Sequence, residues 1–376
     1  MNRKIYLDYA ATTPIHPDVA EYMYEILKSD FGNPSSIHHF GRKSKMIIEN
    51  SRKIIANYIK ASIGEVFFTS GATESCHTIF YSCINDLGVK RIISSVAEHH
   101  CTTHTLEAIQ IKFPEIEIVM LPTDNCGRIS NKSIIETLSG SYKKTLVSLM
   151  HGNNEIGTMH DLEKIGKICL EHKAYFMVDA AQTFGKYPID VNECHISFLT
   201  ASAHKLFGPK GTGLLYINSN NIIKPLFLGG SQERNMRSGT ENVHGIAGFA
   251  KATELALKER VSRTEALRAI KNYCKEKLSE INGLNFNGCT EYSMNHILSV
   301  SFPPSEKSEL IMFNLDIAGI CASSGSACSS GVEHDSHVLQ AIGHDPDRKT
   351  IRFSFSHETT KEDIDYLVDQ LKSICS

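Results

Sequence analysis

The chain of 376 residues contains no tryptophan, and its eleven cysteines are scattered singly, without C-x-x-C spacing. The absence of paired cysteines argues against a zinc ribbon and against the disulfide framework of a small secreted domain. We therefore expect a cytoplasmic protein with reduced thiols, most of them buried and inert, and with no resident metal.

The sequence also lacks any long apolar run. No window approaches the roughly 20 apolar residues of a membrane span, and the first residues, MNRKIYLDYAATTP, show no targeting segment. With 39 basic and 42 acidic residues the net charge is −3, which favours neither nucleic acid nor an anionic membrane as a partner. Hydrophobic residues at 41% and charged residues at 22% are typical of a globular protein with a sizeable core.

From about residue 65, short apolar runs alternate with helical patterns. Several runs are apolar throughout, which is typical of strands covered on both faces. The alternation predicts an α/β fold with a mostly parallel sheet between helices. The expected strands are 66–70, 91–96, 116–121, 145–151, 174–181, 196–201 and 212–217, with helices such as 72–87 and 161–172 between them.

After about residue 245 the pattern changes, and we interpret the rest of the chain as a smaller α/β domain. Its last helix is expected to begin at a Thr359–Thr360 cap, because threonine accepts hydrogen bonds from the first turn of a helix. The other expected elements are a helix at 245–281, a strand at 296–302, a helix at 308–319 and a strand at 350–356.

Lys205 directly follows one of the expected strands, in 202-SAHKLFGPKGTG-213. Open α/β sheets bind ligands at this edge, and a lysine beside a serine, a histidine and a glycine-rich turn suits a Schiff base. A lone lysine at such a turn is more often a surface residue. The stretch lacks the order of a P-loop, and no G-x-G-x-x-G follows a strand, so nucleoside triphosphates and dinucleotides are poor candidates.

Three more stretches end at the same edge of the expected sheet. In 178-VDAAQ-182, Asp179 could pair with a pyridinium nitrogen and Gln182 with the phenolic oxygen of the same ring. The helix start in 69-TSGATES-75 could hold a phosphate, with a hydroxyl from Thr73, and His99 could stack on a ring or transfer protons. Each feature alone also fits an ordinary helix cap or a structural histidine. Together with Lys205 they favour pyridoxal phosphate as the cofactor.

The order of motifs along the chain resembles that of the cysteine desulfurases, which are class V, fold-type I pyridoxal phosphate enzymes. The resemblance extends from about residue 5 to the C-terminus, and the SSGSAC motif resembles that of the class with the longer catalytic loop. The matching blocks are YLDYAATTP (6–14), FGNPSSIH (31–38), FTSGATES (68–75), EHH (98–100), HGNNEIGT (151–158), VDAAQTFGK (178–186), SAHKLFGPKGTG (202–213), RNMRSGTEN (234–242), SSGSACSSG (323–331) and IRFSFS (351–356).

This resemblance implies a large domain built on a mostly parallel seven-stranded sheet and a smaller C-terminal α/β domain. The implied limits are 16–258 for the large cofactor-binding domain, and 1–15 with 259–376 for the small domain. The small domain would carry a mobile catalytic loop at about 321–334.

The resemblance also implies a role for each site residue. Lys205 would hold the cofactor covalently and remove the α-proton of L-cysteine, while His99 would stack on the ring and transfer protons. Arg352 would bind the substrate carboxylate, and Asn154 would lie beside cofactor and substrate. The remaining cofactor ligands would be Asp179 and Gln182 on the ring, and Ala72, Thr73, Ser202, His204 and, from the second subunit of a homodimer, Thr240 on the phosphate.

Cys328 is the implied nucleophile, which would take the sulfur of L-cysteine as a persulfide and leave L-alanine. The acceptor would be a sulfur-transfer partner such as an iron–sulfur scaffold, and Cys328 could transiently contact the cluster. Cys321, next to apolar 315-LDIAGI-320, is expected to anchor the buried end of the loop. Cys101 is expected to be a buried thiol.

Three alternatives stay open. Selenocysteine lyase chemistry differs only in selenium for sulfur, whereas an aminotransferase needs no nucleophilic cysteine. A non-catalytic scaffold or sulfur-relay subunit is disfavoured because every expected catalytic position is filled. The sequence does not identify the sulfur acceptor or its pathway.

Overall fold

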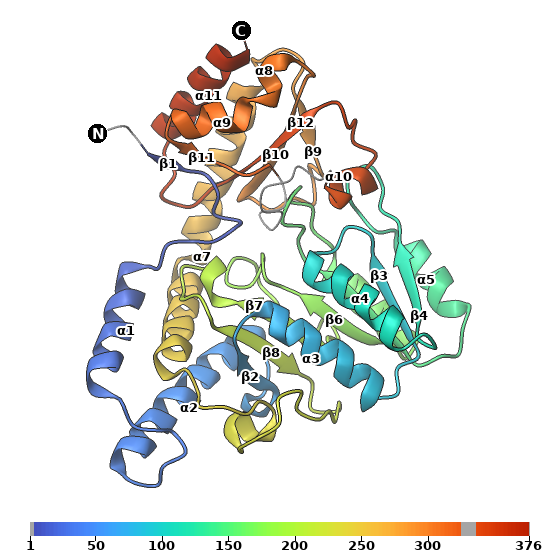
Figure 1. The fold of residues 1–376 in the computed structure, drawn as a ribbon, viewed down its shortest axis with the longest axis vertical. Helices are drawn as coiled ribbons and strands as arrows, with labels where there is room; N and C mark the ends of the chain where they lie inside the picture. The colour runs from blue at the N-terminus through green and yellow to red at the C-terminus, as the bar shows by residue number, and fades with distance from the viewer. Residues whose placement is uncertain (1–3, 325–335, 376) are drawn as a thin grey trace.

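The computed structural model describes residues 4–324 and 336–375 and has two lobes joined by one long helix, α7 (Val243–Leu278) (Figure 1). The larger lobe contains a seven-stranded sheet between helices, and the smaller one contains two small sheets and the C-terminal helix. The N-terminal strand lies in the smaller lobe, so the chain crosses from this lobe into the larger one before α1 (Pro17–Ser29).

The large sheet has the strand order β2-β8-β7-β6-β5-β3-β4. The pairs from β7 to β4 are parallel, whereas β8 is antiparallel to both of its neighbours. Each strand coincides with most of one expected run, so the prediction of an α/β fold with a mostly parallel sheet is confirmed. The strands are β2 (Val66–Thr69), β3 (Arg91–Ser95), β4 (Glu117–Leu121), β5 (Thr145–Met150), β6 (Tyr175–Asp179), β7 (Phe198–Ser202) and β8 (Gly213–Ile217).

Helices cover both faces of this sheet because neighbouring strand residues point to opposite sides. On β7, Phe198 packs in a core with α3 (Ala72–Asn85) and α4 (His100–Lys112), whereas Leu199 packs in a core on the other face. Both residues are fully buried, which explains why these strands are apolar throughout. The helices of the second face are α1, α2 (His39–Ile59), α5 (Asn131–Ser139), α6 (Leu162–Glu171) and the first half of α7.

The small lobe has a core of its own, formed by the end of α7, the strands around residues 298–302 and 351–353, and the C-terminal helix. Its antiparallel sheet has the order β12-β10-β9, and β1 pairs with β11 in parallel. The elements are β1 (Ile5–Tyr6), β9 (Asn285–Asn287), β10 (Ile297–Phe302), α8 (Glu306–Glu309), α9 (Ile311–Ile317), β11 (Ile320–Cys321), α10 (His337–Ala341), β12 (Lys349–Ser354) and α11 (Lys361–Cys375).

Two details of this lobe bear on the sequence predictions. The Thr360 hydroxyl accepts a hydrogen bond from the backbone N–H of Asp363 at 3.2 Å, as expected for the cap of the last helix. The helical stretch expected at 308–319 is found as two short helices, because the helix breaks at Leu310, between α8 and α9. The domain limits at residues 16 and 258 stay predictions, since α7 continues through residue 258 without a break.

The segment after β1 crosses the C-terminal ends of the large sheet and is fixed there by hydrogen bonds. The amide N–H of Thr13 donates to the carbonyl of His204 at 2.9 Å, and the Gln182 side chain donates to the carbonyl of Ala10 at 2.9 Å. This segment therefore forms one wall over the edge where ligands of open α/β sheets bind.

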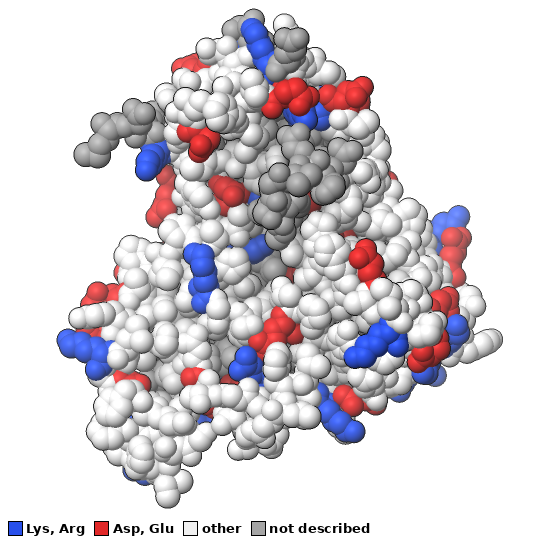
Figure 2. Space-filling view, viewed as in Figure 1, with Lys and Arg blue, Asp and Glu red and all other residues white. Residues whose placement is uncertain are grey.

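On the face shown in Figure 2, basic and acidic side chains are interspersed. Among the described residues, no helix is at once long and apolar enough to cross a membrane.

Candidate active site

A cavity of about 480 Å³ lies at the C-terminal ends of β5, β6 and β7, bounded by the start of α3 and the segment at residues 11–12. Most of the predicted site residues line it, although they come from separate parts of the chain. These are Ala72, Thr73, His99, Asn154, Asp179, Gln182, Ser202, His204 and Lys205.

Lys205 is the last residue of a single turn of 3₁₀ helix, η2 (Ala203–Lys205), that directly follows β7. This turn brings the side chain to the cavity wall at the sheet edge. Its backbone carbonyl accepts a hydrogen bond of 2.8 Å from the Nζ of Lys186. Burial, and secondly the charge of Lys205, lower the pKa of Lys186 to about 7. Two amines thus lie near each other, and the charge of one makes the other easier to deprotonate.

Asp179 is the last residue of β6, a central strand of the sheet. Its Oδ1 accepts the N–H of Ala181 at 2.8 Å, and its side chain is buried. Burial is the main reason that the pKa of Asp179 is raised, with a smaller contribution from Cys101. Because the buried carboxylate is costly in its charged form, a cation placed beside it in the cavity would be stabilised.

The start of α3 offers backbone donors to the same cavity. Gly71 is the N-cap residue and makes no side-chain capping bond, so the first N–H groups of the helix are not capped. A Cβ on Gly213 would lie 2.5 Å from the Cα of Gly71, so only glycine lets β8 approach this turn so closely. Uncapped N–H groups and the positive end of the helix dipole favour an anion here, next to Thr73.

His99 is the N-cap of α4, and its Nδ1 accepts a hydrogen bond of 3.1 Å from the backbone N–H of Cys101. The hydrogen bond between its ring and the Cys101 side chain raises the pKa of His99, against the effect of burial. The expectation that Cys101 is a buried thiol is wrong. Its side chain is partly exposed and lines the cavity, because the first turn of α4 faces the sheet edge.

The other cavity residues already have protein partners. The His204 ring bonds to the Thr12 hydroxyl at 3.0 Å, and burial, then Lys205, lower the pKa of His204 to about 4. Gln182 donates to Ala10 and bonds through Oε1 to the His296 ring at 3.5 Å. These bonds orient the side chains before any ligand is bound.

Arg352 lies on β12 of the small lobe and does not line the cavity. Its guanidinium donates to the carbonyl of Asn154 at 2.9 Å and to the carboxylate of Asp8 at 2.7 Å. Its Nε has no hydrogen-bond partner among the described residues, although the side chain is almost completely buried. The arginine is thus held next to a cavity residue, Asn154, with one donor unused.

Three predicted positions lie away from the cavity or outside the described residues. Thr240 is exposed, in the segment just before α7, and does not line this cavity. Cys328 lies outside the described residues. Cys321 is exposed, so the expectation that it anchors a buried end is wrong. The anchor is the neighbouring Ile320, which is 1% exposed, together with the pairing of β11 with β1.

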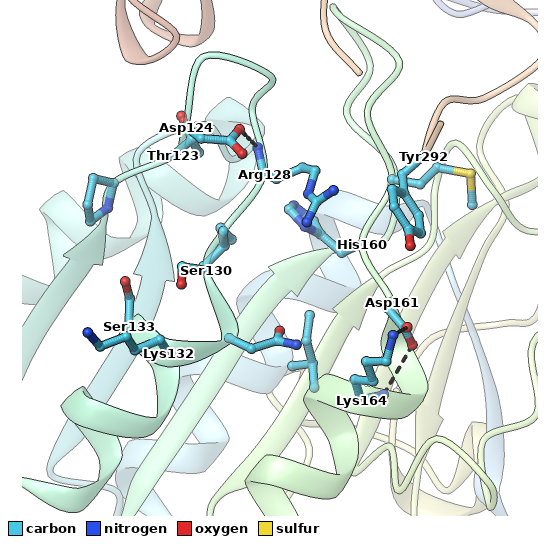
Figure 3. A pocket seen from close by; sticks show the side chains of 15 residues that line it. Thr123, Asp124, Arg128, Ser130, Lys132, Ser133, His160, Asp161, Lys164 and Tyr292 are labelled. Carbon is cyan, nitrogen blue, oxygen red and sulfur yellow. Dashed lines mark hydrogen bonds and ion pairs between the residues drawn. The ribbon is translucent and has the colours of Figure 1, made fainter. Parts of the chain in front are cut away.

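A second cavity, of about 630 Å³, lies beside the end of β4 and the starts of α5 and α6 (Figure 3). The Arg128 guanidinium stacks on the Tyr292 ring at 4.9 Å, and Lys164 pairs with Asp161 at 2.9 Å. None of the predicted site residues lines it.

Comparisons of the sequence and of the structure with known proteins point to one and the same family. Residues 5–367 match the model of the aminotransferase class-V family. The chain is 43% identical, over all of its length and 95% of the relative's, to the cysteine desulfurase IscS of Dictyoglomus turgidum. The chain belongs to the cysteine desulfurases of the aminotransferase class-V family.

Solved structures support this assignment. A NifS-like protein superimposes with a TM-score of 0.91 at 31% identity, with 99% of both chains covered. A structure described as SspA in complex with cysteine superimposes with a TM-score of 0.84 at 30% identity, covering 95% of this chain and all of that one. Members of this family depend on pyridoxal phosphate.

Three residues near the cavity have no role among the expectations from the sequence: the buried Glu98 and His296, and the half-buried Lys186. Burial lowers the pKa of His296 well below its usual value and raises that of Glu98 well above it. Glu98 accepts the N–H of Met150 at 2.9 Å, and its Oε2 has no hydrogen-bond partner within the described part of the chain. Glu98 and Lys186 both stand in motifs of the sequence, 98-EHH-100 and 178-VDAAQTFGK-186. A charged residue within a motif that also holds a predicted site residue was the available signal.

Proposed function

We propose that this chain is a pyridoxal phosphate-dependent cysteine desulfurase, which converts L-cysteine to L-alanine and places the sulfur on Cys328 as a persulfide. The observation that carries the proposal is that Lys205, Asp179 and the uncapped start of α3 meet at one cavity. An amine, a buried carboxylate and an anion site are the three groups that the aldehyde, ring nitrogen and phosphate of this cofactor require.

The residues present fit the cofactor. The buried Asp179 carboxylate would be stabilised by a protonated ring nitrogen, because burial disfavours its charge without a cation. The phosphate would be held by the N–H groups of Ala72 and Thr73, with Ser202 and His204 beside them. Gln182 would meet the ring oxygen, and His99 would stack on the ring. When bound, the cofactor withdraws electrons from the α-carbon of the substrate, which labilises its proton and then activates the sulfur.

The side chains of the protein supply the proton transfers and the orientation. The Lys205 amine would hold the cofactor and then take the α-proton of L-cysteine. The Nζ of Lys186 donates to the backbone carbonyl of Lys205 at 2.8 Å, which would help to fix the position of the η2 turn. Arg352, which donates to the carbonyl of Asn154 at 2.9 Å, would position the substrate carboxylate together with Asn154.

The sulfur transfer itself would belong to Cys328. Its thiolate would attack the sulfur of the substrate, so that a sulfur–sulfur bond forms while the carbon–sulfur bond breaks. The electron pair of that bond stays on carbon, which is protonated to give L-alanine. The persulfide would then pass to an acceptor protein, such as an iron–sulfur scaffold, from a cytoplasmic homodimer.

Replacing Cys328 by alanine tests the proposal. The variant should keep the visible absorption band of bound cofactor but form no persulfide and no alanine, because the cavity is intact and only the nucleophile is missing. Cys321→Ala, which changes an exposed thiol in the same stretch, should keep both band and activity. Mass spectrometry after incubation with L-cysteine should locate one added sulfur atom on Cys328.

Two results would contradict the proposal. Alanine formation that survives in Cys328→Ala would remove Cys328 from its role. A wild-type protein that shows no cofactor band after purification with pyridoxal phosphate would overturn the enzyme assignment. Turnover on L-selenocysteine, compared with L-cysteine, separates a desulfurase from a selenocysteine lyase.

A further inference from the structure

Two cysteines with no part in the proposed reaction lie in contact beside the cavity. Cys76 stands in the second turn of α3 and Cys101 in the first turn of α4, and their Sγ atoms are 3.8 Å apart. Cys76 is completely buried, whereas Cys101 reaches the cavity wall. The two Sγ atoms and a carboxylate oxygen of Asp179 all lie within 4.8 Å of one another.

The two thiols have opposite electrostatic environments. The hydrogen bond with Cys76, and secondly the contact with His99, lower the pKa of Cys101. The same bond and burial raise the pKa of Cys76. The pKa shifts thus favour the thiolate on Cys101, the sulfur that faces the cavity, and the thiol on the buried Cys76. By contrast, burial alone raises the pKa of Cys169 and Cys274, which is typical of inert structural thiols.

We propose that Cys76 and Cys101 form a redox-active dithiol, in which Cys101 reacts with hydroperoxides that enter the cavity and Cys76 resolves the product to a disulfide. An accessible nucleophilic sulfur with a buried partner in contact is the arrangement that this chemistry requires. The pair lies outside the sulfur-transfer steps, so the inference goes beyond the proposed function.

The reaction balances without any further reagent. The Cys101 thiolate attacks one oxygen of the hydroperoxide, the oxygen–oxygen bond breaks, and the leaving oxygen takes a proton as water or an alcohol. Cys101 is then a sulfenic acid, oxidised by two electrons. The sulfur of Cys76 attacks that of Cys101, the sulfur–oxygen bond breaks, and the hydroxide leaves as water with the proton of Cys76.

The geometry permits the second step with small movements. A disulfide needs the sulfurs at about 2.05 Å, so the observed 3.8 Å must shorten by less than about 2 Å. α3 and α4 already pack against one another over the sheet. Closure would remove the Cys101 charge from beside Asp179 and His99, the two residues that the proposed function places on the cofactor ring.

The test oxidises the holoenzyme, purified with pyridoxal phosphate and without L-cysteine, with one equivalent of hydrogen peroxide. A chelator is present throughout, so that metal binding by the thiols does not interfere. After alkylation and digestion without reductant, mass spectrometry should find the peptides of Cys76 and Cys101 joined. Cys76→Ser should instead stop at the sulfenic acid on Cys101, which a dimedone label records. Cys101→Ser should give neither product.

Cys83→Ser is the matched control, because Cys83 is another buried cysteine of α3 and should leave the cross-link unchanged. A wild-type protein in which peroxide leaves both thiols free, or links either to another cysteine, would overturn the proposal even if every variant misfolds. The cross-link is read by mass alone and the cofactor band by absorbance. A failure of the proposed function, seen as a missing band, is therefore distinguishable from a failure of the dithiol.

Discussion

Asp179, at the end of β6, and Glu98, three residues after β3, are both buried carboxyl groups, but their neighbours differ. Lys205 and His99 lie near enough to Asp179 to favour its charged form, against the effect of burial. Glu98 has the backbone N–H of Met150 as a partner and the negative Asp179 nearby, and its pKa is raised well above the usual value. We therefore interpret Glu98 as a protonated, structural group and Asp179 as the carboxylate that acts on a ligand.

This difference predicts the outcome of two amide substitutions. Asp179→Asn should lower alanine formation by about 100-fold or more, because it removes a charge that stabilises the electron-withdrawing ring. Glu98→Gln replaces a protonated acid by a neutral side chain of the same shape, so activity should stay within a few fold. Steady-state kinetics and the cofactor absorption band measure both. Equal losses in the two variants would contradict the assignment of charge.

The sequence could predict that certain site residues lie at strand ends. It could not predict how exposed they are or which side chains from other elements contact them. Asp179 and Lys205 both follow apolar runs, and the parallel sheet brings such positions to one edge. The exposure of Cys101 depends on how the first turn of α4 meets the sheet edge and α3. Its contact with Cys76 joins residues that no local pattern relates.

At the level of elements, the edge strand β2 is tied to the segment before α7 by a buried ion pair. The Arg52 guanidinium on α2 donates to both carboxylate oxygens of Glu233, at 2.7 and 2.9 Å. Glu233 also accepts the N–H of Phe68 on β2 at 2.8 Å. It stands in a left-handed turn, with φ of 45°, as do the next two residues. Such backbone is costly for non-glycine residues, so the pair offsets strain in the segment that leads to Thr240.

Removing one partner of this pair should lower the free energy of unfolding more than neutralising both partners does. Arg52→Met leaves the buried Glu233 carboxylate without its cation, and we expect a loss of about 3–5 kcal/mol in the free energy of unfolding. Adding Glu233→Gln should recover part of that loss, because the remaining group is neutral. Urea unfolding of the two variants measures the difference. A double variant less stable than the single one would show that the pair itself is not responsible.

The periodicity of the sequence predicted the strands of the large sheet because most of them are buried on both faces, which favours runs of apolar residues. It did not predict a helix break in the small lobe. The stretch 308–319 has a helical pattern throughout, yet the chain turns at Leu310, where φ and ψ are −101° and 5°. The left-handed turn at Glu233 depends on a partner from α2, far away in the chain, so no local signal marks it.

The stability of the whole molecule should depend on pH through buried histidines. Burial, and secondly the charge of His160, lower the pKa of His151 to about 3. Between the unfolded value near 6.5 and this value the unfolded chain binds more protons, so stability falls as the pH falls. At about 1.4 kcal/mol per pKa unit, His151 alone should cost about 2 kcal/mol between pH 7 and pH 5.

His151→Gln removes that titration and should make the loss of stability between pH 7 and pH 5 smaller by about 2 kcal/mol. His39→Gln, at an exposed position, is the control and should follow the wild type. Urea unfolding of the three proteins at both pH values gives the comparison. An unchanged pH dependence in His151→Gln would mean that His151 accepts its proton without unfolding.

At the scale of the whole molecule, the proposed homodimer would place one residue of each site on the second chain. Thr240 is exposed and lies away from the cavity of its own chain, and we propose that it contacts the cofactor phosphate of the second subunit. If so, each site needs Lys205 from one chain and Thr240 from the other. Two chains that are inactivated at different residues could then restore one working site when they pair, which a site built within one chain does not allow.

A heterodimer tests it directly. One subunit carries Lys205→Ala and the other Thr240→Asp, whose charge should repel the phosphate, and different tags allow the mixed dimer to be purified. Each homodimer should be nearly inactive. In the heterodimer, the chain that keeps Lys205 would receive an intact Thr240 from its partner, so one site of two should work and activity should reach about half of the wild type. If Thr240 served its own chain, the only lysine-containing site would carry the aspartate, and activity would stay at the level of the Thr240→Asp homodimer or below.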